Sequence, residues 1–175
     1  MIKLDLIDVF STSGKIRTEE LDVDMTSYKT ALVEYEVSRL SKVKLKFENI
    51  GEHRLRVNGS FDLELLIPCD RCLKDVKTKI SCESDFEMTD ELCMDKSEDD
   101  DELSFLQGHE FIVDEFINIS VLMNMPSKVL CREDCKGLCP VCGGDLNETD
   151  CGCDSFVPDP RMARFADIFN AYKEV

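Results

Sequence analysis

Ten cysteines place the strongest constraint on how this 175-residue chain can fold. The first ten residues, MIKLDLIDVF, have no basic start and no long apolar stretch, so we expect no secretion signal and a cytoplasmic protein. In that reducing compartment, closely spaced cysteines more often bind metal or carry redox chemistry than form disulfides. The sequence therefore predicts metal-binding thiols.

The densest group is six cysteines within residues 131–153: Cys131, Cys135, Cys139, Cys142, Cys151 and Cys153. Cys139 and Cys142 are separated by two residues and followed by two glycines, a pattern that favours a tight turn with both sulfurs at one point. Paired thiolates of this kind bind tetrahedral Zn²⁺. The pair that completes the site stays open between Cys131/Cys135 and Cys151/Cys153.

A further CxxC pair, Cys69 and Cys72, lies between two predicted strands. It has three interpretations: a redox dithiol, half of a zinc site completed by the later cysteines, or buried structural thiols. A thioredoxin-like role is disfavoured, because such motifs open a helix after a strand. Eight cysteines in close pairs suffice for two four-thiolate sites, which leaves Cys82 and Cys93 as ordinary residues.

Residues of the first half alternate between apolar and polar, which predicts half-buried antiparallel strands. We expect Asn49-Ile50-Gly51 to form a three-residue turn that pairs residue 48 with residue 52. This register places Lys44 opposite Arg56 and Lys46 opposite Arg54. Together with Lys42, these residues form a cationic face, which is either neutralised by neighbouring carboxylates or contacts RNA phosphates.

Acidic residues concentrate in one segment of a chain whose formal net charge is −16. Residues 83–102 contain eleven carboxylates and a single lysine. Such a run is typical of a solvated linker, and the alternative is an acidic arm that docks on a basic partner. The net charge argues against nonspecific affinity for nucleic acid and leaves room for a local basic patch.

Two helices are predicted in the second half. Residues 113–125 have Asp114 and Glu115 in the first turn and are followed by Pro126, while Asp159 and Pro160 begin an amphipathic helix up to Tyr172. We expect an α+β fold: an antiparallel sheet, as a meander or partly open barrel, with two C-terminal helices flanking a cysteine-rich zinc segment.

Three regions follow from these patterns. Residues 1–88 are expected to form the sheet domain and residues 89–110 an acidic linker or loop. Residues 111–175 would contain the first helix, the zinc knuckle and a C-terminal helix that packs on the sheet. The sequence has no nucleophile elbow, phosphate-binding loop or two-histidine metal motif, and a thiolate-rich zinc site is closed and structural. We therefore expect a protein that is not an enzyme.

Four sequence blocks resemble one family. CDRCL at 69–73, CREDCKGLCPVCGGDLN at 131–147, CGC at 151–153 and DPR at 159–161 are similar to the YceD family of bacterial large ribosomal RNA subunit accumulation proteins. The resemblance implies a non-catalytic role in accumulation or processing of large-subunit (23S) ribosomal RNA. It also implies that Cys69, Arg71 and Cys72 belong to a shared functional region, because some members keep the CxRC segment without the C-terminal cysteines.

Three hypotheses result. The first is a ribosome-biogenesis factor with a structural zinc site and direct RNA contacts. The residues expected to touch RNA are Lys42, Lys44, Lys46, Arg54, Arg56 and Arg71. The second is a zinc-stabilised adaptor that grips a basic partner such as a ribosomal protein, and the third is a redox or hydrolytic enzyme. Neither a membrane nor DNA is an expected partner.

Overall fold

The computed structural model describes residues 1–30, 32–51, 54–89 and 105–153. The chain divides into two compact units. The first, here called the sheet unit, comprises Met1–Pro68 and Asp75–Val129, and the second, the cysteine unit, comprises Cys69–Lys74 and Leu130–Val175. In the described part of the chain, no helix combines the length and the apolar character needed to cross a lipid bilayer.

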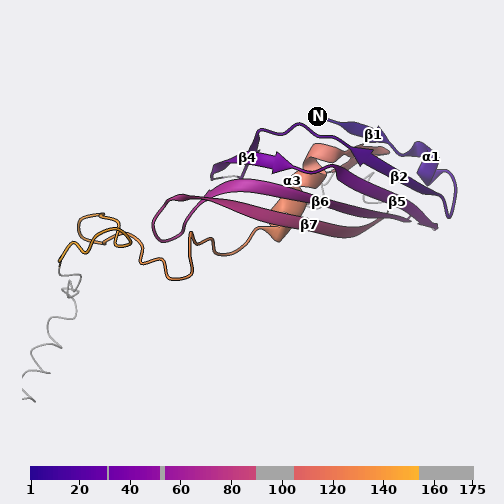
Figure 1. Cartoon of the computed structure of the whole chain (residues 1–175). Coiled ribbons are helices and arrows are strands. Elements are labelled where there is room, and N and C mark those ends of the chain that lie inside the picture. Colours follow the sequence, from indigo (N-terminus) through magenta and orange to yellow (C-terminus); the bar gives the residue numbers. More distant parts are fainter. Residues whose placement is uncertain (31, 52–53, 90–104, 154–175) are drawn as a thin grey trace, which may run out of the picture. The chain divides into compact units, whose positions relative to one another are not determined.

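The sheet unit is built on a six-stranded antiparallel sheet (Figure 1). β5 and β4 pair with successive halves of one edge of β6, β2 and β3 extend them outward, and β7 pairs with the other edge of β6. The strands are β2 (Ile16–Leu21), β3 (Ser27–Lys29), β4 (Glu34–Leu40), β5 (Val43–Gly51), β6 (Arg54–Pro68) and β7 (Asp75–Thr89).

Alternation of apolar and polar residues explains why these strands form, as the sequence predicts. Leu55, Val57, Leu63 and Leu65 of β6 are fully buried, and the even-numbered residues of this strand are partly or fully exposed. A strand that buries every second residue must keep its register, because a slip by one residue would turn all of its apolar side chains outward. The β6–β7 hairpin keeps one register from Arg54↔Thr89 to Pro68↔Asp75 and ends in the loop that contains Cys69 and Cys72.

The predicted turn at residues 49–51 is wrong. β5 continues to Gly51, and Lys44 faces Ser60 while Lys46 faces Asn58. The cause is Asn49, which is only 6% exposed and donates hydrogen bonds from Nδ2 to the carbonyls of Val9 and Phe10 at 2.9 and 3.0 Å. This anchor keeps Asn49 inside the strand, where the register is shifted by a bulge.

The register found differs from the predicted one by an even number of residues, so every side chain keeps its expected face of the sheet. The cross-strand partners change. Arg56 lies opposite Glu48 on one side and Glu87 on the other, instead of facing Lys44. The predicted cluster of directly opposed cations is therefore replaced by alternating charges.

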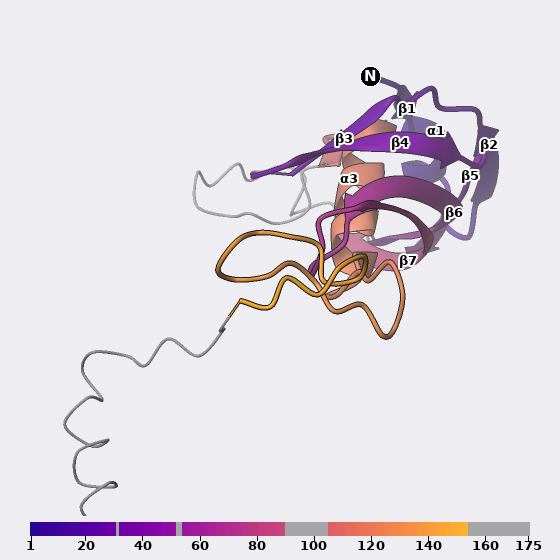
Figure 2. The same cartoon turned by 60° about the vertical axis from the view of Figure 1, so that its left-hand side comes forward.

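A second, three-stranded sheet and one long helix complete the unit. The small sheet has the order β1 (Lys3–Asp5), β9 (Glu110–Ile112), β8 (Leu106–Gln107), and a short helix α1 (Ile7–Phe10) follows β1. Helix α3 (Val113–Asn124) confirms the helix predicted from residue 113 and lies against one face of the large sheet (Figure 2). The described chain is thus mostly β, with antiparallel sheets. The predicted second helix and the acidic residues 90–104 lie outside the described residues.

Aromatic side chains fill the space between α3 and the sheets. Phe116 of α3 meets Phe86 of β7 at a ring-centroid distance of 6.0 Å and Phe111 of β9 at 5.5 Å. Gly59 of β6 lies directly beneath the Phe116 ring, where an added Cβ would meet two ring carbons, one of them at 2.6 Å. The close approach of the helix therefore requires glycine at this position.

We predict that Gly59→Ala destabilises the sheet unit by about 1–3 kcal/mol, because the fully buried Phe116 ring has no free space to move into. Urea unfolding of the full chain measures the effect. Ser60→Ala, at the neighbouring exposed position, is the control and should change stability by less than about 0.5 kcal/mol. Since alanine is otherwise the better residue in a strand, equal or greater stability of Gly59→Ala would contradict the packing described.

Candidate metal centres

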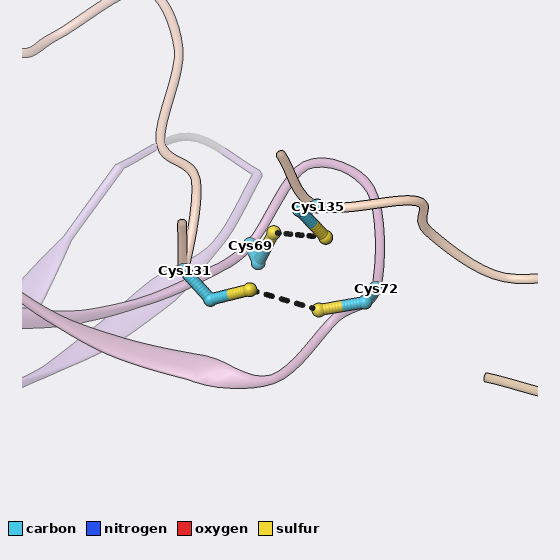
Figure 3. Close-up of side chains that lie close together, drawn as sticks. All are labelled: Cys69, Cys72, Cys131 and Cys135. Atoms are coloured by element: carbon cyan, nitrogen blue, oxygen red, sulfur yellow. Dashed lines mark hydrogen bonds between the residues drawn. The ribbon is translucent and has the colours of Figure 1, made fainter. Parts of the chain in front are cut away.

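The first group of thiols brings together Cys69, Cys72, Cys131 and Cys135 (Figure 3). All four sulfur atoms lie within 4.8 Å of one another. The Sγ–Sγ distance is 3.9 Å between Cys69 and Cys135 and 3.5 Å between Cys72 and Cys131. A tetrahedral zinc ion with Zn–S bonds of about 2.3 Å requires sulfur–sulfur separations of about 3.8 Å. The arrangement therefore fits such an ion.

The group joins distant parts of the sequence. Cys69 and Cys72 lie in the loop between β6 and β7, whereas Cys131 and Cys135 follow α3, and the paired sulfurs are 59 and 66 residues apart along the chain. This arrangement settles two alternatives. Cys69 and Cys72 form half of a four-thiol group, and Cys131 and Cys135 supply the other half.

The second group consists of Cys139, Cys142, Cys151 and Cys153, whose sulfur atoms also lie within 4.8 Å of one another. The structure thus assigns Cys151 and Cys153, rather than Cys131 and Cys135, to the pair with two glycines. Cys139 is buried, while Cys142 and Cys151 are exposed. Cys82 is buried in β7 and belongs to neither group, and Cys93 lies outside the described residues.

The two CxxC turns share one backbone geometry. In the first, the amide of Cys69 donates to the Lys74 carbonyl at 2.8 Å and the amide of Leu73 donates to the Cys69 carbonyl at 2.9 Å. In the second, Cys139 and Gly143 repeat these bonds, with Gly144 as the acceptor of the Cys139 amide, at 2.8 Å each. Both turns therefore have the same knuckle-like backbone, and each belongs to a group that could hold a metal ion.

Sequence reasoning missed this equivalence because the first turn has no glycine. The residue after the second cysteine takes a positive φ in both turns, +61° at Leu73 and +73° at Gly143. Leucine adopts this conformation at a cost of roughly 1–2 kcal/mol. In the described residues, Leu73 is the only non-glycine residue with positive φ. The signal that reveals the knuckle is thus the CxxC spacing, which does not depend on glycine.

Backbone amides make the thiols of Cys69 and Cys139 unusually acidic. Burial opposes ionisation of Cys69, yet the N–H groups of Arg71 and Cys72 lower the pKa of this thiol to about 6. The N–H groups of Cys142 and Val141 lower the pKa of Cys139 to about 6 as well, and the Val141 amide lies 3.4 Å from its Sγ. Amides aimed at sulfur stabilise a thiolate, which is the form that binds metal.

Neighbouring sulfurs act in the opposite direction on other thiols of the same groups. The contact with Cys72 raises the pKa of Cys131 to about 12, and the contact with Cys151 raises that of Cys153 to about 12. Four thiolates so close together repel one another, so the groups cannot ionise completely by themselves. A bound cation removes this repulsion and releases the remaining protons.

Arg71, a predicted RNA contact, is exposed and also forms hydrogen bonds within the first group. Its guanidinium donates to the Cys135 carbonyl at 2.6 Å, and its own carbonyl accepts a hydrogen bond from the Leu138 amide at 3.0 Å. Gly137 lies against this carbonyl, since an added Cβ would come within 2.9 Å of it. Arg71 thus connects the two chain segments that carry the thiols of the first group.

The other predicted RNA-binding residues belong to the sheet unit. Lys44 and Lys46 line a cavity of about 510 Å³ together with Asn58 and Ser60, and Glu83 and Asp85 also line this cavity. The lysines face outward from β5, opposite the polar residues of β6. The structure therefore brings two of the predicted residues into one hollow of the sheet surface.

Carboxylates pair with most of the predicted RNA-binding cations of the sheet, including Lys46. Lys42 Nζ lies 3.7 Å from Asp22, and Lys46 Nζ lies 2.9 Å from Glu48. Arg56 forms ion pairs with Glu87 and Asp85. Arg54 stands at the start of β6, opposite Thr89. The face is consequently a mixture of both charges rather than a continuous basic stripe.

Comparison with known proteins gives one family and three relatives. The family model for "Large ribosomal RNA subunit accumulation protein YceD" matches residues 57–169, which is more than half of the chain. Three uncharacterized proteins, one from Mycobacterium bovis and two from strains of Mycobacterium tuberculosis, are each 25% identical over 138 residues. The match covers 78% of this chain and 66% of each relative. No solved structure matches the chain.

We predict that Leu73→Gly stabilises the metal-loaded cysteine unit by up to about 1 kcal/mol, because glycine adopts the positive φ without strain. The reciprocal change Gly143→Ala should destabilise it by a similar amount. Thermal unfolding of the full chain at a fixed excess of Zn²⁺ measures both variants. A stability loss in Leu73→Gly would show that the two turns are not equivalent.

Proposed function

The chain belongs to the YceD family, and we propose that it promotes the accumulation of large-subunit (23S) ribosomal RNA as a non-catalytic factor whose cysteine unit binds two structural Zn²⁺ ions. The family match and the two four-thiol groups support the proposal together. The single observation that carries the metal part is the convergence of Cys69 and Cys72 with Cys131 and Cys135. The proposed process places the protein in the bacterial cytoplasm, where ribosomes assemble.

The donor atoms favour zinc in a structural role. Each group offers four sulfur ligands, and four-thiolate zinc sites are closed, whereas catalytic zinc keeps one position for water or substrate. When bound, the ion supplies a cross-link between segments that hydrophobic packing does not hold together. Of the eight thiols, Cys69, Cys72, Cys135 and Cys139 are buried. Metal binding of this kind contributes directly to folding free energy.

Direct contact with RNA is best supported at the hollow lined by Lys44 and Lys46. Two ammonium groups beside the hydroxyl and amide side chains of Ser60 and Asn58 suit a phosphate and its sugar. Glu83 and Asp85 in the same hollow would repel a continuous phosphate track. We therefore propose contact with a few phosphates of one RNA segment, and not a general affinity for nucleic acid.

A protein-binding adaptor is the second candidate function. The observation in its favour is that Leu73 and Val141, each within or next to a CxxC turn, are 66% and 55% exposed. Exposed aliphatic side chains on a rigid turn are typical contacts for a protein partner such as a ribosomal protein. Loss of ribosomal-protein binding in Leu73→Ser with Val141→Ser, while RNA binding persists, would favour this function.

We predict that the purified chain contains two zinc ions and that Cys69→Ser with Cys72→Ser contains one, because these changes remove two ligands of the first group only. Elemental analysis against protein concentration gives the stoichiometry. Cys82→Ala is the matched control and should keep both ions, since Cys82 lies in the sheet core. Two ions in the double variant would contradict the ligand assignment.

We predict that Lys44→Gln with Lys46→Gln weakens binding to large-subunit ribosomal RNA and lowers the slope of log K against log salt by about 1.4, or about 0.7 for each lost contact to single-stranded RNA. Filter binding at several salt concentrations measures both quantities.

Lys3→Gln with Lys29→Gln is the control for this experiment, because it removes the same charge from exposed sites that do not line the hollow. An unspecific effect of net charge would change both double variants equally. The RNA contact is refuted if the Lys44 and Lys46 variant binds with unchanged affinity and salt dependence.

A further inference from the structure

The segment of residues 143–150 connects two ligands of the second group, Cys142 and Cys151, yet its side chains contact the first group. The Leu146 amide donates to the Gly137 carbonyl at 3.0 Å, and Asp145 forms a β-bridge with Leu138. These bonds lay the segment along the chain that follows Cys135. One segment is therefore shared by both thiol groups.

Asn147 makes the most direct of these contacts. Its Nδ2 lies 3.4 Å from Cys135 Sγ, within hydrogen-bonding distance of this ligand of the first group. Its Oδ1 accepts hydrogen bonds from the Lys136 amide at 2.8 Å and from the Arg132 guanidinium at 2.7 Å. The side chain is thus held in a fixed orientation, with its amide nitrogen within hydrogen-bonding distance of the sulfur.

Two carboxylates of the same segment contact the Cys69–Cys72 side of the first group. Lys74, two residues after Cys72, forms ion pairs with Asp145 at 2.9 Å and Glu148 at 2.7 Å. Asp145 Oδ1 also accepts a hydrogen bond from Asn147 Nδ2 at 2.7 Å. Residues 143–150 therefore touch both halves of the first group, the Cys69–Cys72 turn through Lys74 and the Cys135 side through Asn147.

From this arrangement we infer that the two groups bind metal cooperatively, with Asn147 as the positioning residue that connects them. An ion in the second group fixes Cys142 and Cys151 and so orders the segment between them. Ordering this segment holds the Asn147 amide against Cys135 Sγ, where it stabilises the thiolate that binds metal in the first group. The inference rests on the proposed zinc binding and adds that an ion in one group favours binding in the other.

Thermodynamic linkage makes the effect reciprocal. If an ion in the second group strengthens binding in the first, an ion in the first strengthens binding in the second by the same factor. Hydrogen bonds to metal ligands typically change affinity by about 10–100-fold when removed. We expect coupling of that size between the two groups.

The test uses the full chain and Zn²⁺ in competition with a chelator of known affinity. At each chelator concentration, free thiols are alkylated and peptides are read by mass spectrometry, so that the occupancy of each group is obtained separately. In Cys142→Ser with Cys151→Ser, the second group cannot bind, and the first should bind Zn²⁺ about 10–100-fold more weakly than in the unaltered chain. Cys69→Ser with Cys72→Ser should weaken the second group by the same factor.

The role of Asn147 is tested by Asn147→Asp, which keeps the Oδ1 acceptor for Lys136 and Arg132 and removes the Nδ2 donor to Cys135 and to Asp145. It should weaken the first group about 10–100-fold in the unaltered background and have little further effect once Cys142 and Cys151 are serine. The control is Asp150→Asn in the same segment, whose side chain accepts from the Gly152 amide at 3.3 Å.

Cobalt gives a readout that altered folding alone would not produce. In the Co²⁺-loaded chain, the thiolate-to-cobalt charge-transfer band should shift in Asn147→Asp and stay unchanged in Asp150→Asn, because only the first removes a hydrogen bond from a coordinating sulfur. Two ions bound independently, with no reciprocal weakening, would overturn the coupling and leave the proposed zinc binding intact. A chain that binds no Zn²⁺ would overturn both the coupling and the proposed zinc binding. If Asn147→Asp behaves like the control, Asn147 does not connect the two groups.

Discussion

Electrostatic repulsion among crowded thiolates is the constraint on which the cysteine unit depends. Four sulfur atoms within 4.8 Å of one another cannot all ionise at neutral pH in the absence of a cation, because thiolates in contact raise the pKa of their neighbours. Backbone amides favour the thiolates of Cys69 and Cys139, and a divalent ion would allow the others to form. The unit thus combines thiols that ionise readily with thiols that stay protonated until a cation binds.

The first CxxC turn closes the hairpin formed by the long strands β6 and β7. The continuous β6–β7 register ends at Pro68↔Asp75, and the six residues that follow Pro68 close the hairpin as the Cys69–Cys72 turn. The knuckle accepts a leucine at positive φ, because the hairpin and the first thiol group fix the backbone at both ends. The loop that closes the β6–β7 hairpin therefore supplies two of the four thiols of the first group.

Local patterns predicted much of this architecture. Apolar alternation gave the strands and their faces, and Asp114, Glu115 and Pro126 marked helix α3 within one residue of its end. Cysteine spacing also indicated the number of thiol pairs. What failed was long-range: the hairpin register depends on Asn49 binding the carbonyls of Val9 and Phe10, forty residues and thirty-nine residues earlier. The partner of each cysteine pair likewise depends on chain topology, and Asn147 became visible only as a neighbour of Cys135.

Two Zn²⁺ ions, each held by four cysteine sulfurs, are proposed to define the cysteine unit. X-ray absorption at the zinc edge of the purified, fully loaded chain tests this proposal most directly, because the scattering shell reports both the ligand element and its distance. We expect four sulfur neighbours per zinc at about 2.3 Å and no nitrogen or oxygen ligand. A shell that contains light-atom ligands, or a sulfur count near two, would contradict it.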